Sequence, residues 1–239
     1  MGGNLEMNGQ GLQRRAMVLL SIVVVLFGGL GPGSCGSPES ENFACTEVIG
    51  FSQTRQWYVD SDFETLVGDG GWQLRAPSGA SIDRWADPTY AGWAQPPYSS
   101  CTDGDPAAPD RVLLTVSGDF GEDVSAWAGA IEAVVHLIEE EKYPEVERIV
   151  LQAVVGGPQA HEEPPCPAGD GFVRASYQHP YIYEATRIVA EEEEAAGHDV
   201  ITGADPHVER CEDYQDATGH LTSGASLAVG HALGEYYAE

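Results

Sequence analysis

The chain has 239 residues and a formal net charge of −27, with 38 acidic side chains against 11 lysines and arginines. This imbalance argues against a nucleic-acid binder, because phosphate binding relies on clustered basic side chains. It also argues against docking on an anionic bilayer through a basic patch. The chain is 42% hydrophobic and 21% charged, which is not the composition of a disordered acidic polymer. We therefore expect one globular domain.

The N-terminal segment has the pattern of an export signal. Arg14 and Arg15 precede the apolar run 16–27, which is too short to span a bilayer comfortably but fits the apolar region of a signal peptide. The first 34 residues contain one acid, Glu6, and these two bases. The remainder therefore holds 37 acids and nine bases, so the exported part would carry a charge of −28.

Cys35 follows the apolar run and is preceded by Gly33 and Ser34. The segment resembles a bacterial lipoprotein signal, in which a small residue precedes the cysteine that is lipidated, although Pro32 stands where that family prefers leucine. Ordinary signal cleavage nearby is the alternative. With lipidation at Cys35, the protein would be held at the cell envelope by its lipid alone. The expected organisation is a signal peptide over 1–35, a polar tether over 36–43 and one domain over 44–239.

The other four cysteines are Cys45, Cys101, Cys166 and Cys211. An even number in an exported chain predicts two disulfides, for which three pairings are possible. Proximity in the sequence favours Cys45 with Cys101 and Cys166 with Cys211. A zinc site or thiolate nucleophile is disfavoured, because the chain has no Cys-x-x-Cys spacing.

Short apolar runs alternate with helical patterns along the domain. The runs 47–51, 111–116, 148–155 and 199–202 predict strands covered on both faces. Because strand and helix alternate, we expect a three-layer α/β/α fold with a central, mainly parallel sheet.

Three helices are expected between and after these strands. The first is capped by Ser125 and ends before Pro144, and the second covers about 182–196 and ends at Gly197. The third starts near Thr222, and its glycines are expected to allow close approach to the sheet. These glycines are Gly224, Gly230 and Gly234.

Residue types for nucleophilic catalysis follow the first strand and precede the last helix. Ser52 lies at the first strand-to-helix turn, and His220 and Asp216 lie in the final loop. A serine needs a base to accept its proton, and that base needs an acid to fix its tautomer. Asp213 is an alternative acid. The Gly-x-Ser-x-Gly turn of α/β-hydrolases is not matched, because Thr54 replaces its last glycine.

The order of these segments resembles the SGNH, or GDSL-type, hydrolase family, whose fold is flavodoxin-like. Gly-Phe-Ser-Gln-Thr is similar to the family's first block, with Phe51 in place of Asp, and Val-Ser-Gly-Asp is similar to its third. The family's last block, Asp-x-x-His followed by Leu-Thr, is matched from Asp216 onward, with one residue inserted between the aspartate and the histidine. The four segments that carry the resemblance are 50–54, 77–81, 116–119 and 216–224.

The resemblance implies a role for each matching residue. Ser52 would attack an ester carbonyl, His220 would act as base and then acid, and Asp216 would orient the imidazole. The oxyanion would lie against Ser52, Gly79 and Gly118. The family has an asparagine at the last of these positions, so Gly118 lacks a side-chain donor.

Two further residues are expected at the substrate. Gln53 would contact it, and Trp85 would contribute to a sugar platform. Three outcomes of the missing oxyanion donor stay open: Gln53 replaces it, the enzyme is slow, or the site is non-catalytic. The expected function is an exported serine esterase that cleaves small acyl groups, such as acetyl, from carbohydrate, with no metal or cofactor. One alternative is a degenerate fold that only binds glycan or protein. Another is a metal-binding surface protein that uses 161–163 and 207–213.

Overall fold

The computed structural model describes residues 43–68, 70–159 and 165–238. The predicted signal peptide, Cys35 and the first residues of the predicted tether lie outside this part of the chain. Within the described ranges, no helix is both long enough and apolar enough to cross a membrane.

A five-stranded parallel sheet forms the centre of the domain, in the order β2-β1-β3-β4-β7. These strands are β1 (Thr46–Ile49), β2 (Trp72–Arg75), β3 (Arg111–Val116), β4 (Arg148–Ala153) and β7 (Val200–Thr202). The four predicted strands are present, and the sequence prediction missed β2. That strand escaped notice because Gln73 and Arg75 interrupt its apolar pattern, although both are buried. A separate antiparallel hairpin consists of β5 (Pro167–Ala168) and β6 (Gly171–Phe172).

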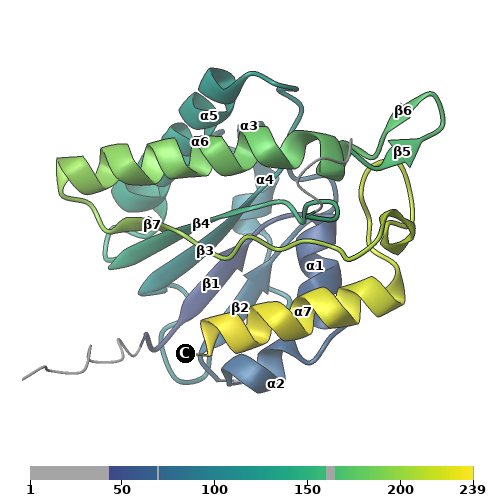
Figure 1. The fold of residues 1–239 in the computed structure, drawn as a ribbon. Helices are drawn as coiled ribbons and strands as arrows, with labels where there is room; N and C mark the ends of the chain where they lie inside the picture. Colours follow the sequence, from purple (N-terminus) through teal and green to yellow (C-terminus); the bar gives the residue numbers. More distant parts are fainter. Residues whose placement is uncertain (1–42, 69, 160–164, 239) are drawn as a thin grey trace, which may run out of the picture. The chain divides into compact units, whose positions relative to one another are not determined.

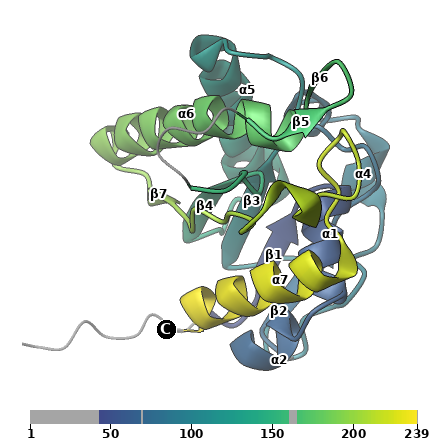
Figure 2. The same ribbon diagram turned by 45° about the vertical axis from the view of Figure 1, so that its right-hand side comes forward.

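Helices cover both faces of the sheet (Figures 1 and 2). On one face lie α1 (Ser52–Val59), α2 (Phe63–Val67) and α7 (Ser223–Tyr237). On the other lie α5 (Val124–Leu137) and α6 (Arg174–Ala196), with α3 (Ile82–Trp85) against α5. The remaining helices are α4 (Ala91–Ala94), a π-helical turn at Ile138–Lys142 and a 3₁₀-helical turn at Cys211–Asp213. The three-layer α/β prediction is therefore confirmed.

The helix ends differ from the prediction in two places. α5 is capped by Asp123, whose carboxylate accepts from the Ala126 amide at 3.0 Å, and not by Ser125. α6 starts at Arg174 and continues through Pro180, which the prediction treated as lying before the helix. Proline removes one backbone hydrogen bond from a helix interior. Burial of His179 and Ile182 on either side of it holds the helix together there.

The glycines of α7 approach helices, which corrects the expectation that they face the sheet. A Cβ on Gly230 would collide with the Trp57 carbonyl of α1, and one on Gly234 would lie 2.7 Å from the Leu66 Cδ1 of α2. A Cβ on Gly224 would meet open space. Two of the three glycines thus let α7 pack closely against its neighbours on the same face.

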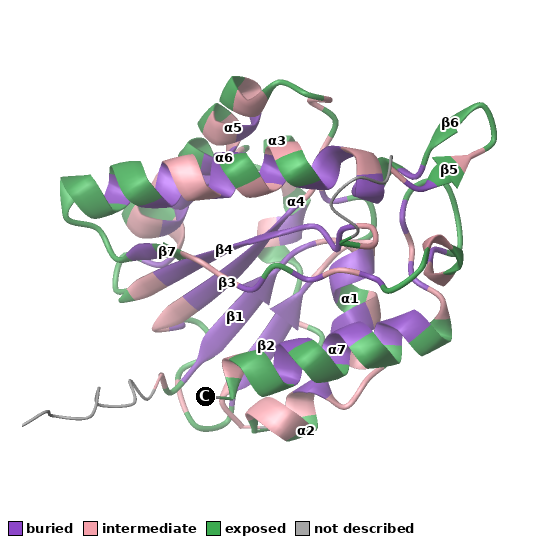
Figure 3. Cartoon of the chain, in the orientation of Figure 1, coloured by how far each residue is buried: buried purple, intermediate pink, exposed green. Residues whose placement is uncertain are grey.

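The buried side chains follow the strands and the inward faces of the helices (Figure 3). Trp57, Trp85 and Trp127 are among the largest fully buried side chains. Burying an aromatic side chain contributes several kilocalories per mole at roughly 25 cal/mol per Å². Each of these three rings therefore contributes substantially to the apolar core.

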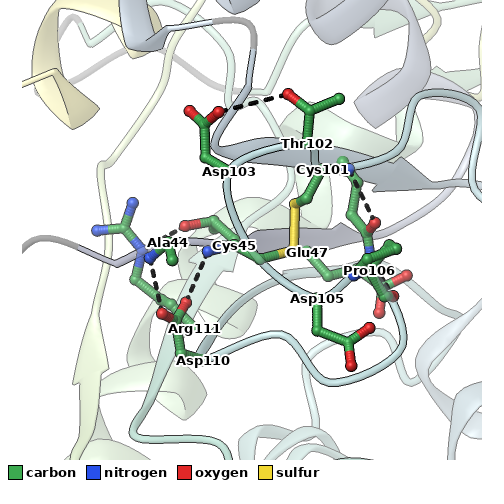
Figure 4. The surroundings of a disulfide bond; sticks show 12 residues. Ala44, Cys45, Glu47, Cys101, Thr102, Asp103, Asp105, Pro106, Asp110 and Arg111 are labelled. Carbon is green, nitrogen blue, oxygen red and sulfur yellow. Dashed lines mark hydrogen bonds between the residues drawn. A yellow bond between two sulfur atoms is a disulfide. The ribbon is translucent and has the colours of Figure 1, made fainter.

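Two disulfides tie loops to this core. Cys45 is bonded to Cys101, with 5.7 Å between their Cα atoms, and Cys166 to Cys211, with 5.2 Å. This is the pairing that sequence proximity favoured. Beside the first disulfide, the Asp110 carboxylate accepts from the Cys45 amide at 2.9 Å (Figure 4). Disulfides persist in oxidising compartments, so the pairing supports export of the protein.

Candidate active site

Ser52 is the first residue of α1, directly after β1. The turn between them is fixed by Thr54, whose hydroxyl accepts from the Phe51 amide at 3.2 Å and contacts the Thr115 hydroxyl of β3 at 2.5 Å. Gly50 is required in this turn, because a Cβ there would collide with both threonine side chains. The turn therefore holds Ser52 at the carboxyl edge of the sheet, where parallel α/β folds place their sites.

His220 lies beside Ser52, with 2.7 Å between its Nε2 and the serine Oγ. The other ring nitrogen, Nδ1, lies 2.6 Å from Asp216 Oδ2. Because a carboxylate only accepts, Nδ1 carries the hydrogen and the Nε2 lone pair faces the serine hydroxyl. The arrangement can therefore remove the proton of Ser52.

The loop that holds Asp216 and His220 is shaped by a second set of hydrogen bonds. Asp216 Oδ1 accepts from the Thr218 hydroxyl at 2.6 Å and from the amides of Thr218 and Gly219 at 2.9 and 3.1 Å. The residue inserted relative to the family pattern is thus accommodated. Asp213 is bonded instead to Arg210. Sequence reasoning overlooked Thr218, although its place between the acid and the base was a usable signal.

Asp216 should make stability depend on pH. Burial alone would raise the pKa of Asp216, but hydrogen bonds from Thr218 and His220 hold that pKa well below its usual range. Because the pKa of Asp216 is lower in the folded state, its ionised carboxylate stabilises the folded protein at pH values above the unfolded-state pKa of about 3.9. This stabilisation is lost as the pH falls through the folded-state pKa. We expect Asp216→Asn to lower the melting temperature at pH 7, with the difference from wild type narrowing below about pH 4.

Thermal melts of both proteins from pH 7 to pH 2 provide the measurement. Asp83→Asn is the matched control, because Asp83 is an exposed carboxylate at the same cavity and should leave the profile unchanged. A difference that stays constant down to pH 2 would show that the ionised form of Asp216 does not stabilise the loop.

Ser52 and His220 open onto a cavity of about 470 Å³. Gly79 and Gly118 line it as well, so all the residues expected around the oxyanion lie at one site. Gly79 has a φ of +69°, a conformation that favours glycine. Asp119, from the predicted segment 116–119, lines the cavity as well. Sequence reasoning missed three further charged residues there, because only the fold brings them to the cavity; they are Asp83, Arg84 and Arg174.

Gly118 stands where the SGNH sequence pattern has asparagine, and buried side chains lie close beside it. A Cβ there would lie 3.0 Å from the Trp127 ring and 3.4 Å from the Ile82 side chain. A larger residue would force these buried side chains to shift. The packing around Gly118 thus accounts for the missing side chain, and any oxyanion donors must be backbone amides or other cavity groups.

Gln53 lines the cavity beside Ser52, and its side chain also supports the loops of the site. Its side chain is 2% exposed, and both ends of its amide are bonded to backbone. The Nε2 donates to the Gly219 carbonyl at 2.6 Å, and the Oε1 accepts from the Val155 amide at 2.8 Å. Gln53 thereby connects the end of β4 to the residue before His220, and its expected contact with substrate stays a prediction.

Replacing Gln53 with leucine should leave both backbone groups unpaired. Each buried unsatisfied group costs roughly 1–3 kcal/mol, so we expect Gln53→Leu to lower the free energy of unfolding by about 2–6 kcal/mol. Urea denaturation measures this, with the neighbouring exposed Arg55→Leu as the control. An unchanged denaturation midpoint would contradict the structural role of Gln53.

Trp85 belongs to the core, so its expected contact with sugar is wrong. The side chain is 1% exposed, and its indole nitrogen donates to the Gly50 carbonyl at 3.2 Å. It packs edge-on against Trp93, with ring centroids 4.8 Å apart. Trp85 therefore supports the turn that holds Ser52.

Metal-ligating side chains gather away from Ser52. Among the described residues, three groups of histidine and carboxylate side chains are close enough to hold an ion, and none of them includes Ser52, His220 or Asp216. The 161–163 cluster of the sequence lies outside the described residues. The groups are His179 with Asp205 and His207, Glu132 with His136 and Glu193, and Glu139 with Glu193 and His198.

No protein-family model matches the chain, and no curated protein matches it in sequence. Solved structures do resemble it. A family two carbohydrate esterase from Clostridium thermocellum, solved in complex with cellohexaose, is 11% identical with a TM-score of 0.50. The alignment covers 82% of this chain and 63% of that one, so the chain spans less than two thirds of the esterase's length.

Two further structures show weaker likeness. A family two carbohydrate esterase from Cellvibrio japonicus is 15% identical over 79% of this chain and 59% of that one, with a TM-score of 0.45. An extracellular lipase from Streptomyces rimosus is 12% identical over 82% of this chain and its full length, with a TM-score of 0.41. Taken with the strand order, the Clostridium likeness shows that the domain has the SGNH-hydrolase fold.

Proposed function

We propose that the protein is an exported serine esterase that removes small acyl groups, such as acetyl, from carbohydrate. The observation that carries this proposal is the chain of contacts from Ser52 through His220 to Asp216, with distances of 2.7 and 2.6 Å, at the edge of a cavity. Nucleophile, base and orienting acid are thereby within hydrogen-bond reach of one another. Lipidation at Cys35 would hold this enzyme at the cell envelope.

In the proposed reaction, Ser52 Oγ attacks the ester carbonyl while His220 Nε2 takes its proton. The bond to the alcohol then breaks, and His220 returns the proton to the departing oxygen. Water attacks the acyl-serine in the same way, which releases the acid and restores Ser52. Asp216 stabilises the imidazolium in both steps.

The developing oxyanion would be held by the amides of Ser52 and Gly79. The first of these lies at the N-terminus of α1, where helix amides have no partner within the helix. Gly118 supplies no side-chain donor, and loss of one such donor costs on the order of 10²–10³ in turnover in other hydrolases. We therefore expect a slow esterase. The carbohydrate substrate is proposed from the Clostridium structure, which holds cellohexaose.

The missing donor at Gly118 also favours a second candidate, a degenerate SGNH fold that binds acylated carbohydrate without cleaving it. Release of acetate from acetylated xylan and of p-nitrophenol from p-nitrophenyl acetate separates the two. The esterase proposal expects both releases, and their loss after treatment with phenylmethylsulfonyl fluoride. If calorimetry detects binding of acetylated xylan but neither acetate nor p-nitrophenol is released, the esterase proposal is overturned in favour of the binding module.

A further inference from the structure

Three side chains from distant parts of the chain converge beside the end of β4. His179 comes from α6, and Asp205 and His207 come from the segment after β7. Asp205 Oδ1 lies 2.8 Å from His179 Nε2 and 3.0 Å from His207 Nε2. One ligand atom from each residue lies within 4.8 Å of the other two. None of the three lines the cavity of Ser52.

The backbone beneath this group is fixed. Gly156, just beyond β4, forms a parallel bridge with His207. Its amide donates to the Pro206 carbonyl at 2.8 Å, and its carbonyl accepts from the Val208 amide at 3.0 Å. A Cβ on Gly156 would lie 2.8 Å from atoms of both imidazole rings, so glycine is needed for the rings to approach.

The orientation of the His207 ring is that of a metal ligand. His207 Nδ1 donates to the Gly157 carbonyl at 2.5 Å, which directs Nε2 toward Asp205 and His179. Ligating histidines usually donate their second ring nitrogen to a carbonyl or carboxylate in this way. His179 is 5% exposed, and among the described residues its Nε2 has no hydrogen-bond partner of good geometry despite its closeness to Asp205. A buried nitrogen is therefore directed into the group without a satisfactory partner.

We propose that His179, Asp205 and His207 bind a divalent transition metal of the zinc class through His179 Nε2, His207 Nε2 and a carboxylate oxygen of Asp205. Two imidazoles and one carboxylate form a ligand set typical of zinc, with bonds of about 2.0–2.2 Å. Tetrahedral ligands at that distance lie about 3.3 Å apart, so the two contacts with Asp205 would open by a few tenths of an ångström, while the two imidazole nitrogens already lie within 4.8 Å of each other.

A fourth position is accessible from solvent. Asp205 and His207 line a cavity of about 600 Å³ between the segment after β7 and α7, so water can complete the coordination from that side. The ion would join α6 to the segment that leads to the Asp216 loop. An ion that binds the folded state and not the unfolded state stabilises the folded state by mass action. Metal binding is therefore expected to raise the free energy of unfolding of the domain.

Untagged protein stripped with chelator and then titrated with Zn²⁺ provides the test, read by calorimetry and by thermal melting. We expect one ion per chain and, at about 100 times the dissociation constant, a rise in melting temperature of roughly 5–10 °C. His207→Ala should weaken the affinity by at least about 100-fold, while His198→Ala, in an exposed histidine–carboxylate group, should not change it.

Circular dichroism checks that His207→Ala is folded, and Asp205→Asn provides a second variant on an exposed side chain that should also weaken binding. Absorption of bound Co²⁺ in the visible range reports tetrahedral coordination directly. Two results would overturn the proposal. One is the absence of binding to the stripped wild-type protein, and the other is binding that both of these variants retain.

Discussion

Replacing Ser52 with alanine is expected to lower kcat/KM for p-nitrophenyl acetate by about 10³-fold or more, because the variant has no nucleophile to form the acyl-enzyme. Removing the serine or histidine of such a triad in other hydrolases leaves only the residual catalysis of oxyanion donors and binding. His220→Ala should cost about as much, and the double variant little more. The measurement is the initial rate of p-nitrophenol release over a range of substrate concentrations.

Ser78→Ala is the matched control, because Ser78 lines the same cavity and is exposed. It should keep most of the wild-type rate, and both variants should keep the wild-type circular dichroism spectrum. Equal rates for wild type and Ser52→Ala would show that any hydrolysis comes from another group.

Replacing Arg75 with methionine is expected to cost about 3–5 kcal/mol of unfolding free energy, the usual cost of leaving a buried charge unpaired. Arg75 on β2 donates to Glu47 on β1 at 2.7 Å, and the Glu47 side chain is fully buried. Arg75 also donates to the carbonyls of Trp93 and Gln95. Burial raises the pKa of Glu47 even with the guanidinium and the Tyr143 hydroxyl beside it. Removal of Arg75 would therefore leave the buried carboxylate without its charged partner.

Urea denaturation of the single and double variants tests this account. Glu47→Leu combined with Arg75→Met should recover part of the lost stability, since a buried ion pair replaced by apolar residues is often neutral or better. Arg187→Met breaks an exposed pair with Glu184 and should hardly move the midpoint. A midpoint for Arg75→Met equal to that of Arg187→Met would mean that Glu47 is not held as a buried charge.

Much of the sheet could be predicted because its strands are continuous apolar runs. β3 and β4 are covered on both faces, so their sequences need no polar alternation. β2 could not be predicted, because Gln73 and Arg75 are buried through partners that lie elsewhere in the chain. The start of α6 was missed for a related reason, since tertiary packing tolerates Pro180.

The candidate site was predictable in part, because the family's segment order brings Ser52 and His220 together although 168 residues separate them. Exposure was not predictable from residue type, and for that reason the expected contact of Trp85 with sugar failed. The His179 group had no usable spacing in the sequence. Its ligands come from α6 and from a loop, and only the packing of β4 against that loop brings them together.

Covalent labelling with a fluorophosphonate tests the proposed chemistry most directly, since the reagent modifies a serine that a neighbouring base has activated. The labelled protein is digested, and the adduct is located by mass spectrometry. In the wild-type protein we expect one adduct, on the peptide that contains Ser52. The adduct should be absent from His220→Ala and present in Ser78→Ala. No adduct at Ser52 in folded wild-type protein, or equal labelling of the His220→Ala variant, would contradict the proposed chemistry.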